Sequence, residues 1–176
     1  MKLGVIAALS AISLFLATAP VVGAAIDDAK AGIEAAQAGK FKQAVDAFTR
    51  AIAAGELKPL ALALVYNNRA HAYNELKQYE DAVTDATEAI KLNPKYANAY
   101  NTLGNAYRRQ SKYREAINYY SKAILLEPAA DYFANRCLAR GQNDQPEIAV
   151  PDCEKALSID RDHKRAKAIL TILRKR

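Results

Sequence analysis

A 34-residue period runs through the middle of the chain and limits its possible folds more than any other feature. Residues 66–94 align with residues 100–128, and equivalent residues coincide at six places: Tyr66 with Tyr100, Tyr73 with Tyr107, Tyr79 with Tyr113, Ala82 with Ala116, Ala89 with Ala123, and Pro94 with Pro128. Within each copy, apolar or small residues recur at steps of three and four in two stretches, which predicts two amphipathic helices. Such repeats stack into a solenoid, because one unit alone cannot bury its apolar face.

The last unit of the chain departs from this pattern but still aligns with it. Phe133 takes the place of Tyr66, and the same register puts Ala149 and Ala156 at the positions of Ala82 and Ala89. Pro146 replaces the aromatic residue that opens the second helix, and Pro151 falls inside that helix. We expect Pro151 to remove one backbone hydrogen bond and to bend the helix.

The period and its fixed residues resemble the tetratricopeptide repeat family. The third unit carries the closest match, with Tyr100, Leu103, Gly104, Tyr107, Ala116, Tyr120, Ala123 and Pro128. In an earlier unit, Gly32, Ala44, Phe48 and Ala51 take the family's small and aromatic positions, and the longer connection AAGELKPLAL leads to the second unit. The resemblance implies an all-α fold, a right-handed α-solenoid of four helix-turn-helix units at about residues 25–58, 63–96, 97–129 and 130–163.

Residues 164–176 predict a basic capping helix. Its apolar residues, Ala166, Ile169, Leu170 and Leu173, would point inward, and its basic residues would point toward solvent. A terminal repeat needs such a cap because no neighbour covers it.

The N-terminal segment predicts export. Met1 and Lys2 precede an uncharged apolar run, and Val22 and Ala24 are the small residues of a cleavage site, which together indicate a signal peptide over residues 1–24. The alternative is a retained membrane anchor, since the apolar run is nearly long enough to span a bilayer. With cleavage before Ala25, the protein would be periplasmic or secreted, where disulfides persist.

Composition and motifs argue against catalysis and nucleic-acid binding. The chain has 25 basic and 19 acidic residues, and much of the excess lies at the C-terminus instead of in a basic stripe with interleaved aromatics. We find no phosphate-binding loop or nucleophile elbow, and His71, His163 and the two cysteines do not show zinc-ligand spacing. We therefore expect a non-enzymatic protein without metal or cofactor, whose partner is another protein and not a nucleic acid; it would contact a membrane only if the N-terminal segment is retained.

The family resemblance also suggests where a partner would bind. In that family the first helix of each pair lines a concave groove, and the matching positions are Asn67, His71, Asn74, Asn98, Asn101, Asn105 and Arg108. Asparagine is a poor helix former, whereas its amide can donate to and accept from a peptide backbone. The alternative is that these residues are simply a hydrated surface.

Some family members hold the acidic C-terminal tails of heat-shock proteins with a clamp based on lysine and asparagine. This chain has Asn67, Asp131 and Asn135 where that clamp requires lysine or arginine, so that activity is not expected. The expected function is an adaptor or scaffold of the cell envelope whose groove accepts a peptide or loop of another protein. The alternative is an accessory subunit that positions or regulates an envelope hydrolase through its convex or end surfaces.

The two cysteines, Cys137 and Cys153, are expected to face each other in the fourth unit. They take the places of Gly104 and Tyr120, and their midpoint lies in the turn between the two helices. Facing Cα atoms of packed helices lie roughly 4–6 Å apart, a range that overlaps that of disulfides. The prediction is a disulfide between the helices, and the alternative is two buried thiols.

Overall fold

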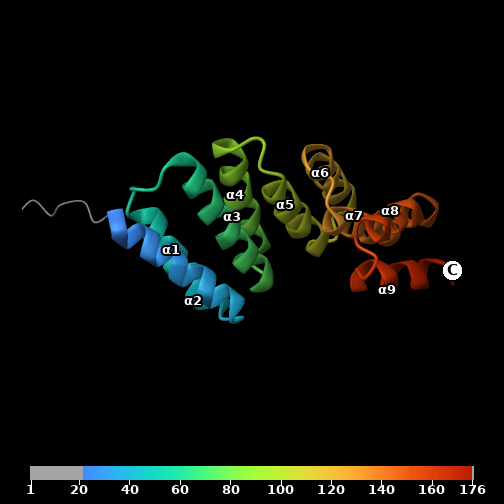
Figure 1. The fold of residues 1–176 in the computed structure, drawn as a ribbon, viewed down its shortest axis with the longest axis horizontal. Coiled ribbons are helices and arrows are strands. Elements are labelled where there is room, and N and C mark those ends of the chain that lie inside the picture. Colours follow the sequence, from blue (N-terminus) through green and yellow to red (C-terminus); the bar gives the residue numbers. More distant parts are fainter. Residues whose placement is uncertain (1–21, 176) are drawn as a thin grey trace, which may run out of the picture.

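The computed structural model describes residues 22–175, and this part of the chain forms nine α-helices and no strand. The helices are α1 (Val22–Gln37), α2 (Phe41–Ala53), α3 (Pro59–Glu75), α4 (Tyr79–Leu92), α5 (Ala97–Arg109), α6 (Tyr113–Leu126), α7 (Ala130–Gln142), α8 (Pro146–Ile159) and α9 (Lys164–Leu173). Figure 1 shows the helix pairs following one another along the long axis of the molecule, from α1 and α2 to α9. The predicted all-α repeat fold is confirmed.

Each helix packs against the next one in the chain, and each odd-numbered helix also contacts the next odd-numbered one. The first helices of the four pairs and the terminal helix meet in the order α1, α3, α5, α7 and α9. We call these five the inner helices. They place residues from distant parts of the sequence on one continuous face, where the groove was expected.

Small residues allow the two helices of a pair to approach closely. A Cβ atom on Gly32 would lie 2.5 Å from the ring of Phe48, and one on Gly104 would lie 2.7 Å from the ring of Tyr120. The equivalent positions in the second pair are Ala70 and Ala86, and in the fourth pair Cys137 and Cys153, all fully buried. Each aromatic ring therefore fills the space left by the missing side chain opposite it.

The turn inside each pair has the same backbone conformation. One residue per turn has a positive φ angle: Gly39, Lys77, Ser111 and Asp144. The amide of the following residue then donates to a carbonyl five residues earlier, at Ala35, Tyr73, Tyr107 and Arg140. This pattern is the Schellman termination of a helix. Three of the four turns form it without glycine, at a cost of roughly 1–2 kcal/mol for a residue with a Cβ.

The second pair begins earlier than the sequence predicted. Helix α3 begins at Pro59, whereas the repeat was expected from residue 63. Proline is favoured in the first helical turn, because its missing amide proton has no acceptor there and its φ angle is already helical. Residues 59–62, assigned to a connection in the sequence analysis, therefore belong to the helix.

Pro151 does not end helix α8, which continues from Pro146 to Ile159. A side chain of α7 bonds to α8 near this proline. Nη1 of Arg140 donates to the carbonyl of Ile148 at 3.0 Å and to Oδ2 of Asp152 at 2.8 Å. A side chain from the neighbouring helix thus contacts α8 on both sides of the proline.

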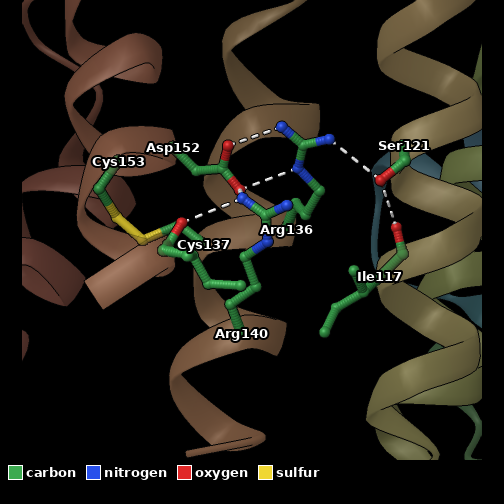
Figure 2. A network of polar contacts seen from close by, with 8 residues as sticks. Ile117, Ser121, Arg136, Cys137, Arg140, Asp152 and Cys153 are labelled. Atoms are coloured by element: carbon green, nitrogen blue, oxygen red, sulfur yellow. Dashed lines mark hydrogen bonds and ion pairs between the residues drawn. A yellow bond between two sulfur atoms is a disulfide. The ribbon is translucent and has the colours of Figure 1, made fainter. Parts of the chain in front are cut away.

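An arginine–aspartate pair joins the two helices of the fourth pair (Figure 2). Nε and Nη2 of Arg136 donate to the two carboxylate oxygens of Asp152 at 2.8 and 2.7 Å, and Nη1 donates to Ser121 of α6 at 3.0 Å. The second pair repeats this arrangement with Arg69, Asp85 and Thr49 at 2.7–2.9 Å. We call each three-residue arrangement an Arg–Asp lock, because it ties a helix pair both internally and to the pair before it.

The cysteines lie on facing helices, with Cα atoms 5.5 Å apart and their sulfur atoms joined. Figure 2 shows them beside the Arg–Asp lock of the fourth pair. Both are fully buried, and Ile169, Leu170 and Leu173 of α9 pack over them. The four apolar residues of the cap are therefore buried as expected. Whether the disulfide forms in the protein depends on its compartment, and it stays a prediction.

Most of the predicted signal peptide, residues 1–21, lies outside the described residues. Helix α1 begins at Val22, so the predicted cleavage site at Val22 and Ala24 falls in its first turn. A cut before Ala25 would leave most of α1 in place. Among residues 22–175, none of the helices is both long enough and apolar enough to cross a membrane.

Candidate functional site

Three neighbouring hollows follow the inner helices and define an inner groove. The first, about 370 Å³, is lined by α1, α2 and α3 and includes Ile33, Asn68 and His71. The second, about 230 Å³, lies between α3, α5, α7 and α9. The third, about 110 Å³, lies between α7 and α9. His71 lines both the first and the second hollow, and Leu138 lines both the second and the third.

The second hollow is mainly polar, and we call it the basic cavity. Its lining residues are His71, Asn74, Glu75, Asn105, Arg108, Arg109, Leu138 and Arg165. They come from the last turns of α3 and α5, from the middle of α7 and from the start of α9. The stacking of the inner helices therefore brings together residues up to 94 positions apart in the chain.

Four of the seven predicted groove residues line the basic cavity. They are His71 and Asn74 from α3 and Asn105 and Arg108 from α5. The side chain of His71 is exposed, whereas that of Asn74 is buried and donates through Nδ2 to the carbonyl of Thr102. Asn105 accepts a hydrogen bond from the Tyr120 hydroxyl at 2.8 Å.

The other three predicted groove residues bond either to the N-cap residue of the next helix pair or to its first helix. Nδ2 of Asn67, a buried residue, donates to the hydroxyl of Tyr96. Asn98 accepts from the Tyr132 hydroxyl at 2.8 Å, and Asn101 accepts from Nδ2 of Asn135 at 2.9 Å. These amides thus hold neighbouring repeats together. The sequence analysis placed these asparagines on the correct helices. It did not predict that their side-chain amides would form hydrogen bonds to other residues of the chain.

The structure adds four residues that the sequence analysis did not assign to the groove: Glu75, Arg109, Leu138 and Arg165. Glu75 and Arg109 form an ion pair at 2.6 Å across α3 and α5, at equivalent positions one period apart. Arg165 was expected to face solvent with the other basic residues of the cap. It is exposed, but it also lines the cavity and donates to Oδ1 of Asn135 at 2.7 Å. The 34-residue spacing of Glu75 and Arg109 was the available signal for their contact.

The positive charges of the cavity act on one buried phenol. Burial raises the pKa of the Tyr120 hydroxyl to about 12, and the positive charges of Arg108, Arg165 and Arg109 act on this group in the opposite direction. Tyr120 lies on α6, behind Gly104 of α5, and its hydroxyl donates to Asn105, which lines the cavity. Arg109 is paired with Glu75, and the field of Arg108 and Arg165 favours an anion in the cavity.

Helix pairs of this period, with a capping helix, define an α-helical repeat scaffold. Two models of the tetratricopeptide repeat match residues 61–124 and 101–160, and together these matches span more than half of the chain. The chain belongs to the tetratricopeptide repeat family. Proteins of this family mediate protein–protein interactions and are generally not enzymes.

The chain also resembles individual proteins of known sequence or structure. Over 64 residues it is 39% identical to the mitochondrial import receptor subunit TOM70 of Homo sapiens. This alignment covers 36% of this chain and 10% of TOM70. A chain of the APC/C hetero-tetramer Cut9-Hcn1 has a TM-score of 0.76 at 20% identity, covering 85% of this chain and 30% of that chain. TTC0263, a thermophilic TPR protein of Thermus thermophilus, has a TM-score of 0.73 at 18% identity, covering 85% of this chain and 81% of that chain. The chain spans about a tenth of the length of the curated relative, and the two structures share the fold.

Proposed function

We propose that this protein is an exported, non-enzymatic adaptor or scaffold of the cell envelope, whose inner groove binds a peptide or loop of another protein. The observation that supports this most is the basic cavity, where buried polar atoms remain without a partner. Oδ1 of Asn74 and Nε of Arg108 are buried and have no hydrogen-bond partner among the described residues. An unsatisfied buried polar atom costs about 1–3 kcal/mol, and a peptide would recover this free energy where the Asn74 and Arg108 side chains turn toward it.

The proposed location depends on the N-terminal segment. The basic start, the apolar run and the small residues before Ala25 support a cleaved signal peptide, and the protein would then act in the periplasm or outside the cell. N-terminal sequencing of the protein from the envelope fraction is expected to begin at or near Ala25. Recovery of Met1 from membrane pellets would instead support the membrane-anchored alternative.

Site-specific photo-crosslinking tests the groove. His71 is exposed and lines two of the three hollows, so a benzoylphenylalanine at this position would lie against a bound segment. In cells that produce the full chain, we expect an adduct whose crosslinked peptide maps to one segment of an envelope protein. The matched control carries the same group at Asn118, an exposed residue of α6 outside the groove.

Crosslinking at these two positions also distinguishes binding in the groove from binding at the other surfaces. Adducts at residue 118 without adducts at residue 71 would contradict groove binding. That result would favour the accessory subunit that acts through its convex or end surfaces.

A further inference from the structure

The basic cavity has more positive than negative charge. It contains the guanidinium groups of Arg108, Arg109 and Arg165, whereas its carboxylate, Glu75, is paired with Arg109. Among the described residues, Arg108 and Arg165 have no carboxylate within ion-pair distance. The cavity therefore carries two guanidinium groups whose charge is not neutralised by the protein. A carboxylate is the complementary group that a protein partner can supply.

The unpartnered atoms of the cavity give the same indication. Nε of Arg108 is a buried donor, and Oδ1 of Asn74 is a buried acceptor. With the two side chains turned toward the cavity, a carboxylate would satisfy the donor and a neighbouring backbone amide would satisfy the acceptor. A sulfate ion offers acceptor oxygens but no donor, so a peptide segment fits the pair of atoms better than sulfate does.

An apolar hollow adjoins the basic cavity along α9. It is lined by Leu138, Gly141, Gln142, Ile169, Ile172 and Leu173, and Leu138 belongs to both spaces. Ile172 is 58% exposed although it lies on the terminal helix beside this hollow. An apolar side chain placed here would cover exposed hydrophobic surface.

The spacing of the two spaces matches an extended peptide. Arg165 and Ile169 are one helical turn apart on α9, a rise of about 6 Å. In an extended chain, residues i and i+2 point to the same side about 6.6 Å apart. The side chain of peptide residue i can therefore enter the basic cavity while the side chain of residue i+2 enters the apolar hollow.

We propose that the inner groove recognises an extended peptide segment in which an aspartate or glutamate lies two residues from a large apolar residue. The carboxylate lies between Arg108 and Arg165, and the apolar side chain lies between Leu138 and Ile169. This proposal rests on the proposed peptide-binding function and specifies the chemistry of the partner.

Fluorescence anisotropy with blocked peptide mixtures tests this specificity. The probes are fluorescein-labelled peptides, capped at both ends, with Leu-x-Asp or Asp-x-Leu among otherwise degenerate uncharged positions, and matched mixtures with asparagine in place of aspartate. In one of the two orientations, we expect the acidic mixture to bind the purified full chain about tenfold more tightly than the amide mixture, since hydrogen bonds to charged groups are the stronger ones. Raising the salt concentration is expected to reduce this preference.

Three variants identify the residues responsible. In Arg108→Gln and Arg165→Gln, the preference for the acidic mixture over the amide mixture is expected to fall at least fivefold. The matched control is Arg114→Gln, which removes the same charge from an exposed position of α6 outside the groove and is expected to retain the preference. Circular dichroism confirms that each variant is folded, and the salt series on the unmodified chain gives a result that does not depend on any variant.

Equal binding of the acidic and amide mixtures, or binding of neither, would overturn this proposal. Photo-crosslinking at His71 is an independent measurement. An adduct there, combined with equal binding of the two mixtures, would retain the groove and reject only its preference for an acidic segment.

Discussion

Arg69 and Arg136 hold equivalent positions in the second and fourth helix pairs, and each bridges three helices. The third pair differs, because Leu103 and Tyr119 occupy the places of the arginine and the aspartate. Leu103 is buried, and both residues belong to one apolar cluster. The same fold therefore accepts a bidentate ion pair and an apolar pair at equivalent positions. This agrees with the finding that a buried ion pair often stabilises no more than apolar residues of similar volume.

Substitutions at the second Arg–Asp lock test this equivalence. Asp85→Ala leaves the guanidinium of Arg69, whose side chain is only 14% exposed, without its carboxylate, and we expect a loss of about 3 kcal/mol in the free energy of unfolding. Arg69→Leu combined with Asp85→Tyr copies the third pair, and we expect it to lose less than half as much. Urea denaturation of both variants measures the difference. A double variant as unstable as the single one would show that the ion pair itself stabilises this position.

The asparagines show where sequence reasoning reached its limit at this scale. Helical periodicity placed Asn98, Asn101 and Asn105 on one face of α5, and the structure agrees. It could not show that hydroxyl or amide donors from Tyr132, Asn135 and Tyr120 would bond to all three. Two of these contacts join residues 34 positions apart, so pairing polar residues at the repeat period would have revealed them.

At the scale of the element, the α7–α8 pair combines two features that affect stability in opposite directions. Pro151 removes a backbone hydrogen bond from α8, while Arg140 of α7 bonds to this helix and the two cysteines face each other across the pair. The sequence predicted that the two cysteines lie opposite each other on the facing helices, because the turn is midway between them, and their Cα atoms are 5.5 Å apart. It did not predict the contacts of Arg140 with α8, because such contacts depend on side-chain conformations and not on repeat spacing.

We predict that Cys137 and Cys153 form a disulfide in the exported protein. Its reduction is expected to lower the free energy of unfolding by about 3 kcal/mol. The control is Cys137→Ala with Cys153→Ala, which copies Ala70 and Ala86 of the second pair and should fold but show no response to reductant. Mass spectrometry of a non-reduced digest detects the bond. Two free thiols that can be alkylated would contradict the prediction.

For the whole molecule, the 34-residue period was sufficient to predict the architecture, since each repeat contacts only its neighbours. The start of α3 at Pro59 was not predicted, because the longer connection before it has no equivalent in the other repeats. The basic cavity was predicted only in part. Arg165 belongs to the cap and not to a repeat, so no alignment of the repeats would place it beside Arg108.

Removal of the cap tests how far the last pair depends on it. Ending the chain after Asp160 exposes the cluster around the cysteines and removes Ile169, Leu170 and Leu173, which are buried. At about 1.5–3 kcal/mol for each buried side chain, we expect a loss of roughly 5–8 kcal/mol in the free energy of unfolding. Chemical denaturation measures this loss. Removal of residues 174–176 alone is the control and should have little effect, because the Arg174–Glu154 ion pair is exposed. Equal midpoints for the two truncations would contradict the prediction.

Because Arg165 lies on α9, ligand binding in the groove is coupled to the docking of α9 against the last helix pair. A ligand that contacts Arg165 binds only when α9 is docked, so the equilibrium between docked and detached α9 and the binding equilibrium share one free energy of coupling. Ligand binding would slow amide hydrogen exchange in α9, and a variant with a loosened α9 would bind more weakly by the same factor. The C-terminal helix would then act as a reporter of whether the groove is occupied.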